Sequence, residues 1–101
     1  MVLEAGIEHY VVIRAERARY YVRKVRWEGR RHAPDRVFAR KDRGTVYIEF
    51  KRPGEKPRTG QLSEHRKMRA AGMEVHVCDN IADALDILWL TPGHNGGPPL
   101  I

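Results

Sequence analysis

The segment DRVFARKDRGTVYIEFK, residues 35–51, decides the fold of this chain of 101 residues. Its two halves, 35–40 and 45–51, are rich in β-branched and aromatic residues, and the polar tetrad 41–44 separates them. Two such runs around a short turn that contains glycine predict a β-hairpin. The length of the turn fixes which residues face each other across the two strands.

The predicted hairpin gathers three charged side chains. It places Asp35 opposite Glu49 to within one residue. Because residues i and i+2 of a strand share a face, Glu49 and Lys51 project together, whereas Phe50 faces the other way. Two carboxylates and a backbone carbonyl, here that of Phe50, offer the oxygen ligands that Mg²⁺ or Mn²⁺ prefers. Such a metal lowers the pKa of a bound water, and Lys51 can orient this water and stabilise charge on a phosphoryl group.

A simpler interpretation is that Asp35 caps a strand and that Glu49 and Lys51 form an ordinary exposed ion pair. An isolated E-x-K triplet is frequent by chance. Glu49 lies in the apolar run VYIEF, however, where an unpaired charge costs free energy unless a metal or another cation faces it. The surrounding sequence therefore favours a functional site.

Periodicity predicts the elements that precede the hairpin. Residues 4–19 have the 3.6-residue period of a helix, residues 20–26 alternate as a strand, and 27–34 form a loop. The apolar face of the helix is expected to consist of Ile7, Tyr10, Val11 and Ala18.

Cap and turn residues define the elements that follow. Residues 52–58 form a second loop, Thr59 caps a helix over 60–71, and Gly72 ends it. Residues 73–78 alternate as a fourth strand. Asp79 or Asn80 then caps a last helix that runs to about Trp89.

This order, α-β-β-β-α-β-α, indicates an α/β fold: a single small domain with a central mixed β-sheet flanked by helices. The domain is expected to span residues 1–90. Residues 91–101, rich in glycine and proline, form a C-terminal tail to which we assign no chemistry.

The charge of the chain points to a polyanionic partner. The formal net charge is +6, and nine basic against three acidic residues between Arg14 and Arg36 account for the whole excess. Tyr20, Tyr21 and Trp27 lie among these charges and could stack on bases. No apolar run is long enough to cross a membrane. Cys78 is the only cysteine, which excludes an intramolecular disulfide, and we interpret it as a small core residue.

Several motifs together resemble the VRR-NUC family (virus-type replication-repair nucleases) of the PD-(D/E)XK superfamily, whose fold is restriction-endonuclease-like. The resemblance covers about Glu4 to Leu88. It rests on GRRHAPDR at 29–36, IEFKRPGEKPRTGQ at 48–61 and HRKMRAAGMEVHVCD at 65–79, after an N-terminal helix that carries Glu4 and Glu8. The sequence departs from the family pattern at Glu28 and His32, where proline and glycine are expected.

The resemblance implies roles for individual residues. Asp35 and Glu49 would be metal ligands with the Phe50 carbonyl, Lys51 would be catalytic, and Gln61 would support the site. The first helix would add a carboxylate from Glu4 or Glu8, which lie one turn apart and share a face. Around this site, the residues expected to contact DNA phosphates are Lys24, Arg26, Arg30, Arg31, Arg36 and Arg52. His65 shares a helical face with Gln61 and could reach the edge of the site, but packing is its expected role.

The function that the resemblance implies is that of an Mg²⁺- or Mn²⁺-dependent DNA endonuclease acting on branched DNA such as four-way junctions. Such an enzyme would work as a homodimer without a small-molecule cofactor, in the cytoplasm of a bacterial or phage-infected cell. The open sheet edges, Trp89, Leu90 and residues 98–101 would supply the dimer interface. The alternatives are a non-catalytic module that binds DNA or RNA, and a nuclease of the same chemistry that cuts flaps or duplex DNA.

Overall fold

The computed structural model describes residues 3–91, so the expected tail beyond Thr91 lies outside the described residues. The expected order of elements is confirmed, and the elements are α1 Glu4–Arg17, β1 Tyr21–Lys24, β2 Arg36–Arg40, β3 Gly44–Phe50, α2 Thr59–Ala70, β4 Val75–Cys78 and α3 Ile81–Ile87. The four strands form one sheet in the order β1-β2-β3-β4. The pairs β1–β2 and β2–β3 are antiparallel, and β3–β4 is parallel, which makes the sheet mixed.

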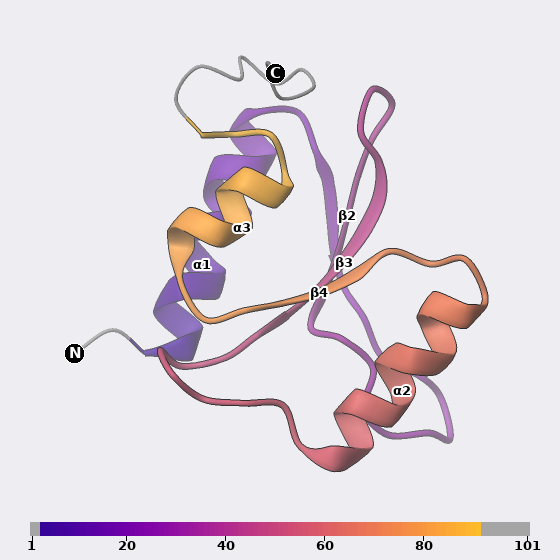
Figure 1. The fold of residues 1–101 in the computed structure, drawn as a ribbon. Coiled ribbons are helices and arrows are strands. Elements are labelled where there is room, and N and C mark those ends of the chain that lie inside the picture. The colour runs from indigo at the N-terminus through magenta and orange to yellow at the C-terminus, as the bar shows by residue number, and fades with distance from the viewer. Residues whose placement is uncertain (1–2, 92–101) are drawn as a thin grey trace.

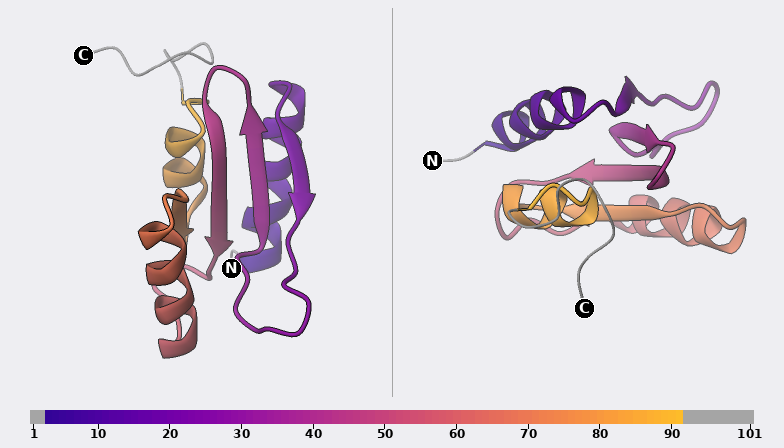
Figure 2. Two further views of the ribbon diagram at one scale, coloured as in Figure 1. Left: turned by 90° about the vertical axis from the view of Figure 1, so that its right-hand side faces the viewer. Right: turned by 90° about the horizontal axis from the view of Figure 1, so that it is seen from above.

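Helices cover both faces of this sheet. α1 and α3 lie together on one face, and α2 lies on the other (Figure 1). The β2–β3 turn lies at one end of the sheet, and the loop between β1 and β2 extends beyond the opposite end, where α2 begins (Figure 2). Loops and helix termini thus converge at the end of the sheet where β3 finishes.

Successive side chains of strand β3 point to opposite faces of the sheet. Val46, Ile48 and Phe50 are fully buried in the core cluster that contains Ile7 of α1. Glu49 lies on the other face and contacts side chains of α2. One strand therefore secures the core with one face and presents polar groups with the other.

Helix α1 ends two residues earlier than expected. Ala18 caps it, and Arg19 follows with a left-handed φ of 69°, a conformation that does not continue a helix. The buried face of the helix is formed by Ile7, Val11 and Ala15. The prediction that Tyr10 is buried is wrong: its ring is 43% exposed and packs against the Arg14 guanidinium.

The other boundaries shift by a few residues. Thr59 is the first residue of α2 and not its cap, because the extended backbone precedes it at Arg58. Gly72 follows α2 with a φ of 88°, as its expected role at the helix end requires. Asn80, one of the two expected caps, accepts a hydrogen bond from the N–H of Asp83 at the start of α3.

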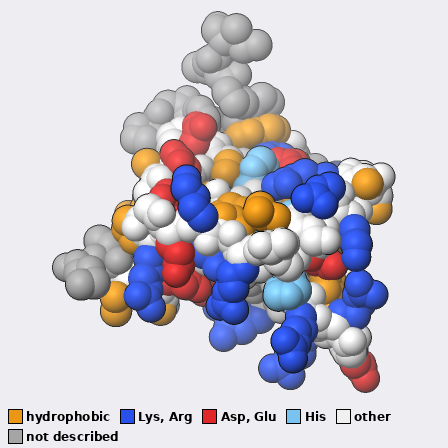
Figure 3. Space-filling model, turned by 60° about the horizontal axis from the view of Figure 1, so that its bottom comes forward, with side chains coloured by type: hydrophobic (Ala, Val, Ile, Leu, Met, Phe, Trp, Pro, Cys, Tyr) orange, Lys and Arg blue, Asp and Glu red, His pale blue; other side chains and the backbone are white. Residues whose placement is uncertain are grey.

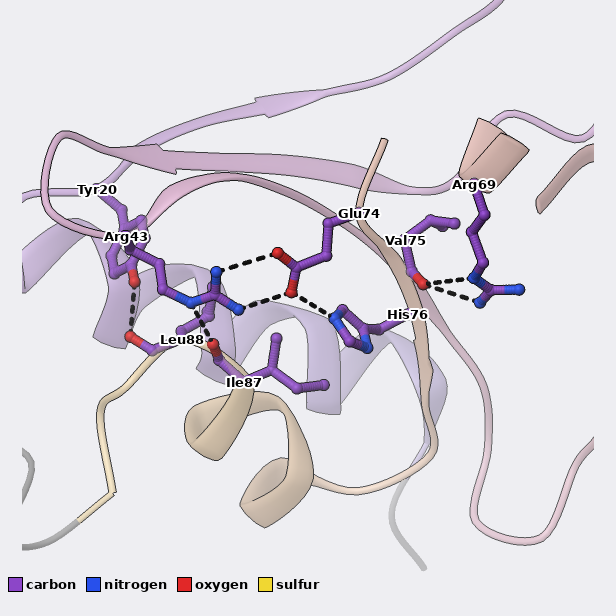
Figure 4. A network of polar contacts seen from close by, with 8 residues as sticks. All are labelled: Tyr20, Arg43, Arg69, Glu74, Val75, His76, Ile87 and Leu88. Carbon is purple, nitrogen blue, oxygen red and sulfur yellow. Dashed lines mark hydrogen bonds and ion pairs between the residues drawn. The ribbon is translucent and has the colours of Figure 1, made fainter. Parts of the chain in front are cut away.

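Side chains from earlier parts of the chain bind the last carbonyls of α3. Tyr20 Oη donates to the Leu88 carbonyl over 2.6 Å, and Arg43 Nε donates to the Ile87 carbonyl over 2.9 Å (Figure 4). The Arg43 guanidinium also holds both carboxylate oxygens of Glu74, over 3.1 and 2.7 Å. These bonds satisfy carbonyl groups that a helix end leaves without partners.

Two residues that the sequence assigned to a dimer interface, Trp89 and Leu90, are half-buried. The Trp89 ring lies 4.9 Å from the Arg43 guanidinium, and Leu90 packs against the core cluster. Both contacts lie within one chain. Residues 98–101 lie outside the described residues. Among residues 3–91 no helix is long and apolar enough to cross a membrane.

Candidate active site

The hairpin register brings Asp35 and Glu49 side by side. Arg36 pairs with Ile48 and Val37 with Tyr47, so the next pair outward is Asp35 with Glu49. The Phe50 N–H donates to Asp35 Oδ2 over 2.7 Å, and the Asp35 carbonyl accepts from the Val25 N–H. The predicted juxtaposition of the two carboxylates is therefore present, and hydrogen bonds to both neighbouring strands fix Asp35 in place.

Glu49 is a buried carboxylate with few charges to compensate it. It is only 4% exposed, and Lys51 Nζ lies 3.8 Å from its Oε2. Burial, and secondarily repulsion from Asp35, raise the pKa of Glu49 to about 7, against the opposing effect of Lys51. Burial also raises the pKa of Asp35, although the hydrogen bond from Phe50 opposes this shift. The site therefore concentrates negative charge that a cation would stabilise.

Gln61 connects α2 to this carboxylate. Its Oε1 accepts from the Arg58 N–H over 2.8 Å, which fixes the orientation of the amide at the helix start. Its Nε2 consequently points to Glu49 Oε2, to which it donates over 2.8 Å. The Gln61 amide thus binds one carboxylate oxygen of Glu49, Oε2, and does not bind the other, Oε1.

That second oxygen faces His65, one turn further along α2. The His65 side chain is 1% exposed, and its Nε2 lies 3.6 Å from Glu49 Oε1. Within residues 3–91, neither this oxygen nor either ring nitrogen of His65 has a hydrogen-bond partner. Sequence reasoning assigned His65 to packing. The signal for a polar role was its spacing of four residues from Gln61, which places both on one face of the helix.

Glu4 and Glu8, the two α1 carboxylates that the sequence offered for the site, differ in their surroundings. Glu8 accepts a hydrogen bond of 2.6 Å from Arg36, so both side chains are engaged within the chain. Glu4 and Glu8 line a cavity of about 290 Å³ together with Arg52. Throughout residues 3–91, no three His, Cys, Asp or Glu side chains converge closely enough to hold an ion as they stand. The structure therefore brings Asp35 and Glu49 together, and Glu8 and Glu4 lie near enough for their charges to contribute to the raised pKa of Asp35.

The chemistry of this donor set fits a hard divalent cation. Its donors are carboxylate and carbonyl oxygens, the kind that Mg²⁺ and Mn²⁺ prefer. Glu49 Oε1 is buried with no partner among the described residues, and such an orphaned oxygen is costly unless a ligand satisfies it. A cation between Asp35 and Glu49 would also offset the repulsion that raises the pKa of Glu49.

The basic side chains expected around the site are mostly free to meet a partner. Five of the six are exposed, and Arg36, bound to Glu8, is the exception: the exposed residues are Lys24, Arg26, Arg30, Arg31 and Arg52. Lys and Arg side chains are prominent on the face formed at this end of the molecule (Figure 3).

The three aromatic residues that could stack on bases differ in exposure, and the expectation is wrong for Tyr20. Tyr20 is 5% exposed and bound to Leu88, which removes it from any surface. Trp27 packs against Tyr47 with ring centroids 6.4 Å apart. Tyr21 is 56% exposed, with the Arg23 guanidinium over its ring.

Known proteins resemble this chain in both sequence and structure. A protein named "Putative nuclease p44", from Acyrthosiphon pisum secondary endosymbiont phage 1, is 35% identical over 80 residues, which cover 79% of this chain and 86% of that protein. A solved structure described as a VRR_NUC domain is 31% identical and superposes with a TM-score of 0.75, covering 83% of this chain and 91% of that one. A scan against family models found no match.

The fold and the two relatives thus identify the chain as a nuclease, a hydrolase that acts on nucleic acids. The chain belongs to the VRR-NUC family, as the resemblance in its sequence predicts.

Proposed function

We propose that this nuclease is a divalent-metal-dependent DNA endonuclease whose site is formed by Asp35, Glu49, Lys51 and Gln61. The observation that carries the proposal is the buried carboxylate of Glu49. It lies beside Asp35 in the hairpin, and one of its oxygens has no partner within residues 3–91. Two adjacent acids, one of them buried, cost free energy that a bound cation would offset.

In this proposal Asp35, Glu49 and the Phe50 carbonyl hold Mg²⁺ or Mn²⁺. The bound cation would polarise the scissile phosphate and lower the pKa of a water. Lys51 Nζ, 3.8 Å from Glu49 Oε2, orients that water and stabilises the charge that develops as its oxygen bonds to phosphorus and the bond to the leaving sugar oxygen breaks. Gln61 keeps the Glu49 carboxylate in one orientation through its 2.8 Å hydrogen bond. Of the two candidate α1 carboxylates, Glu8 is paired with Arg36, and Glu4 supplies the additional acidic oxygen.

We further propose that the substrate is branched DNA and that two copies of the chain act together. A junction with two-fold symmetry needs two sites at a fixed spacing, which a symmetric dimer provides. Strands β1 and β4 are the edges of the sheet, and a second copy can pair with or cover such an edge. Sedimentation at working concentration tests the dimer, and a strict monomer would overturn it.

A cleavage assay on labelled four-way junction, flap and linear duplex DNA, with Mg²⁺, Mn²⁺ or EDTA, tests the proposal. Paired nicks on the junction that require metal, and that Lys51→Ala abolishes without loss of DNA binding, are expected. Cleavage of flaps or duplex alone would support the metal-dependent nuclease but overturn the proposal that four-way junctions are the substrate. DNA binding with no cleavage of any substrate would instead identify a binding module.

A further inference from the structure

A second concave surface lies beside the candidate active site, between the β1–β2 loop and α2. This hollow of about 320 Å³ is lined on the loop side by Arg30, Arg31 and His32, and on the helix side by Ser63, Glu64 and Lys67. Three cationic side chains face one carboxylate, so the hollow carries a net positive charge. The described contacts assign it no function within the chain.

His32 has an unusual backbone in this hollow. Its φ is 71°, in the left-handed region that few residues other than glycine adopt. This conformation is unfavourable for a residue with a Cβ, so the loop holds the imidazole in place against backbone strain. The ring lies directly over Gly60 of α2, where a Cβ would come within 2.3 Å of its Nε2. His32 and Gly60 thus fit each other and hold the loop against the helix.

We propose that this hollow binds a backbone phosphate of the nucleic-acid strand, next to the scissile one, with Lys67, Ser63 and His32 as ligands in addition to Arg30 and Arg31. The inference rests on the proposed function, because it concerns the same substrate. Gln61, which reaches the candidate metal site, and Lys67 are both on α2, six residues or about 9 Å apart along its axis. A distance of this size would place the hollow at a phosphate next to the reacting one along the DNA strand, and not at the reacting phosphate itself.

Substitution of Lys67 tests the proposal. The binding of fluorescently labelled DNA, measured by anisotropy in EDTA over a range of salt concentrations, should weaken several-fold in Lys67→Ala. The slope of log affinity against log salt should fall by about 0.9, the value for one phosphate contact. Lys41→Ala is the matched control: Lys41 is also exposed but lies in the β2–β3 turn, at the other end of the sheet (Figure 2). Lys41→Ala should change the DNA affinity and the salt slope much less than Lys67→Ala does.

His32→Asn separates ligand binding from folding. Asparagine tolerates the left-handed backbone, so the substitution adds no backbone strain. The loss of the ring over Gly60 should lower the melting temperature only modestly, while DNA affinity falls several-fold. If wild type binds DNA and Lys67→Ala matches Lys41→Ala, the hollow is not a subsite, although the proposed nuclease stands. If wild type binds no DNA at all, both proposals fail. If inorganic phosphate shifts the amide signals of residues 29–32 in wild type only, while both lysine variants bind DNA equally, the hollow serves a free anion and the inference is wrong.

Discussion

His65 Nε2 and Glu49 Oε1 lie 3.6 Å apart, both buried and neither with a hydrogen-bond partner in the described chain. The pair occupies the side of the carboxylate opposite Gln61. Small movements of either side chain would close a hydrogen bond and fix Glu49 from both sides. His65 is therefore a candidate positioning residue, which acts on a proposed metal ligand and does not touch the substrate.

We expect His65→Leu to weaken Mn²⁺ binding by a factor of about 10 to 100, the usual effect of losing a group that orients a ligand. Its free energy of unfolding should stay the same or rise, because the substitution removes two buried nitrogens that lack partners. Titration calorimetry and urea unfolding measure the two quantities. His65→Gln, which retains a donor, should recover part of the affinity. Equal Mn²⁺ affinity in wild type and His65→Leu would mean that His65 only packs in the core and does not position Glu49.

The stability of the metal-free protein should depend on Glu49 and on pH. The pKa of Glu49 in the folded protein is about 7, against an ordinary value of 4.5. Between these values the folded state binds a proton that the unfolded state has released, so this contribution to stability is lost as the pH rises from 4.5 through 7. The shift corresponds to about 3 kcal/mol. Glu49→Gln should therefore become progressively more stable than wild type over this range, in urea unfolding with EDTA. A difference that does not vary with pH would contradict the raised pKa.

Divalent metal should reverse that loss of stability. A ligand that binds only the folded state stabilises it by about 2.7 kcal/mol at a hundred times its Kd. At about pH 8, Mg²⁺ or Mn²⁺ should therefore raise the melting temperature of wild type but not of Asp35→Asn or Glu49→Gln. Glu74→Gln is the control, since it also removes a carboxylate but lies in the network with Arg43. An equal response of all four proteins would place metal binding elsewhere.

Much of this site could be predicted because it is local in sequence. A short turn and strict alternation determine the register of the β2–β3 hairpin, and the register alone brings Asp35 to Glu49. The helical period likewise places Gln61 and His65 on one face of α2. In contrast, the ion pair between Arg36 and Glu8 joins residues 28 positions apart and depends on how α1 packs against the sheet. No local pattern contains that information.

The predictions that were wrong also concern positions that depend on long-range packing. Tyr10 fits the apolar period of α1, but Ala15 occupies the buried position and Tyr10 remains exposed. Tyr20 was expected on a basic surface because its neighbours in sequence are charged. Its burial depends on α3, whose Leu88 carbonyl accepts its hydroxyl from 68 residues away.

Arg43 should contribute more to stability than its place near a surface turn implies. Its guanidinium binds Glu74 and the Ile87 carbonyl, and its side chain is only 13% exposed. Arg43→Ala would leave these acceptors unsatisfied, at a cost of about 2 kcal/mol in the free energy of unfolding. Amide hydrogen exchange in α3 should also accelerate. Lys41→Ala, two positions away and exposed, should have no comparable effect in urea unfolding. A similar loss of unfolding free energy in Arg43→Ala and Lys41→Ala would show that Arg43 has no special part in stabilising α3.

The bonds that hold α3 also bear on synthesis at the ribosome. The carbonyls of Ile87, Leu88 and Leu90 bind side chains that precede them by 44, 68 and 76 residues. A nascent chain that has completed the β2–β3 hairpin must still wait about 2 to 8 s for α3 at ordinary elongation rates. During that interval α1 can pack against β1 and β3 but lacks the contacts that α3 provides. Chaperone capture and aggregation would compete with folding most strongly in this window, before the last strand and helix emerge.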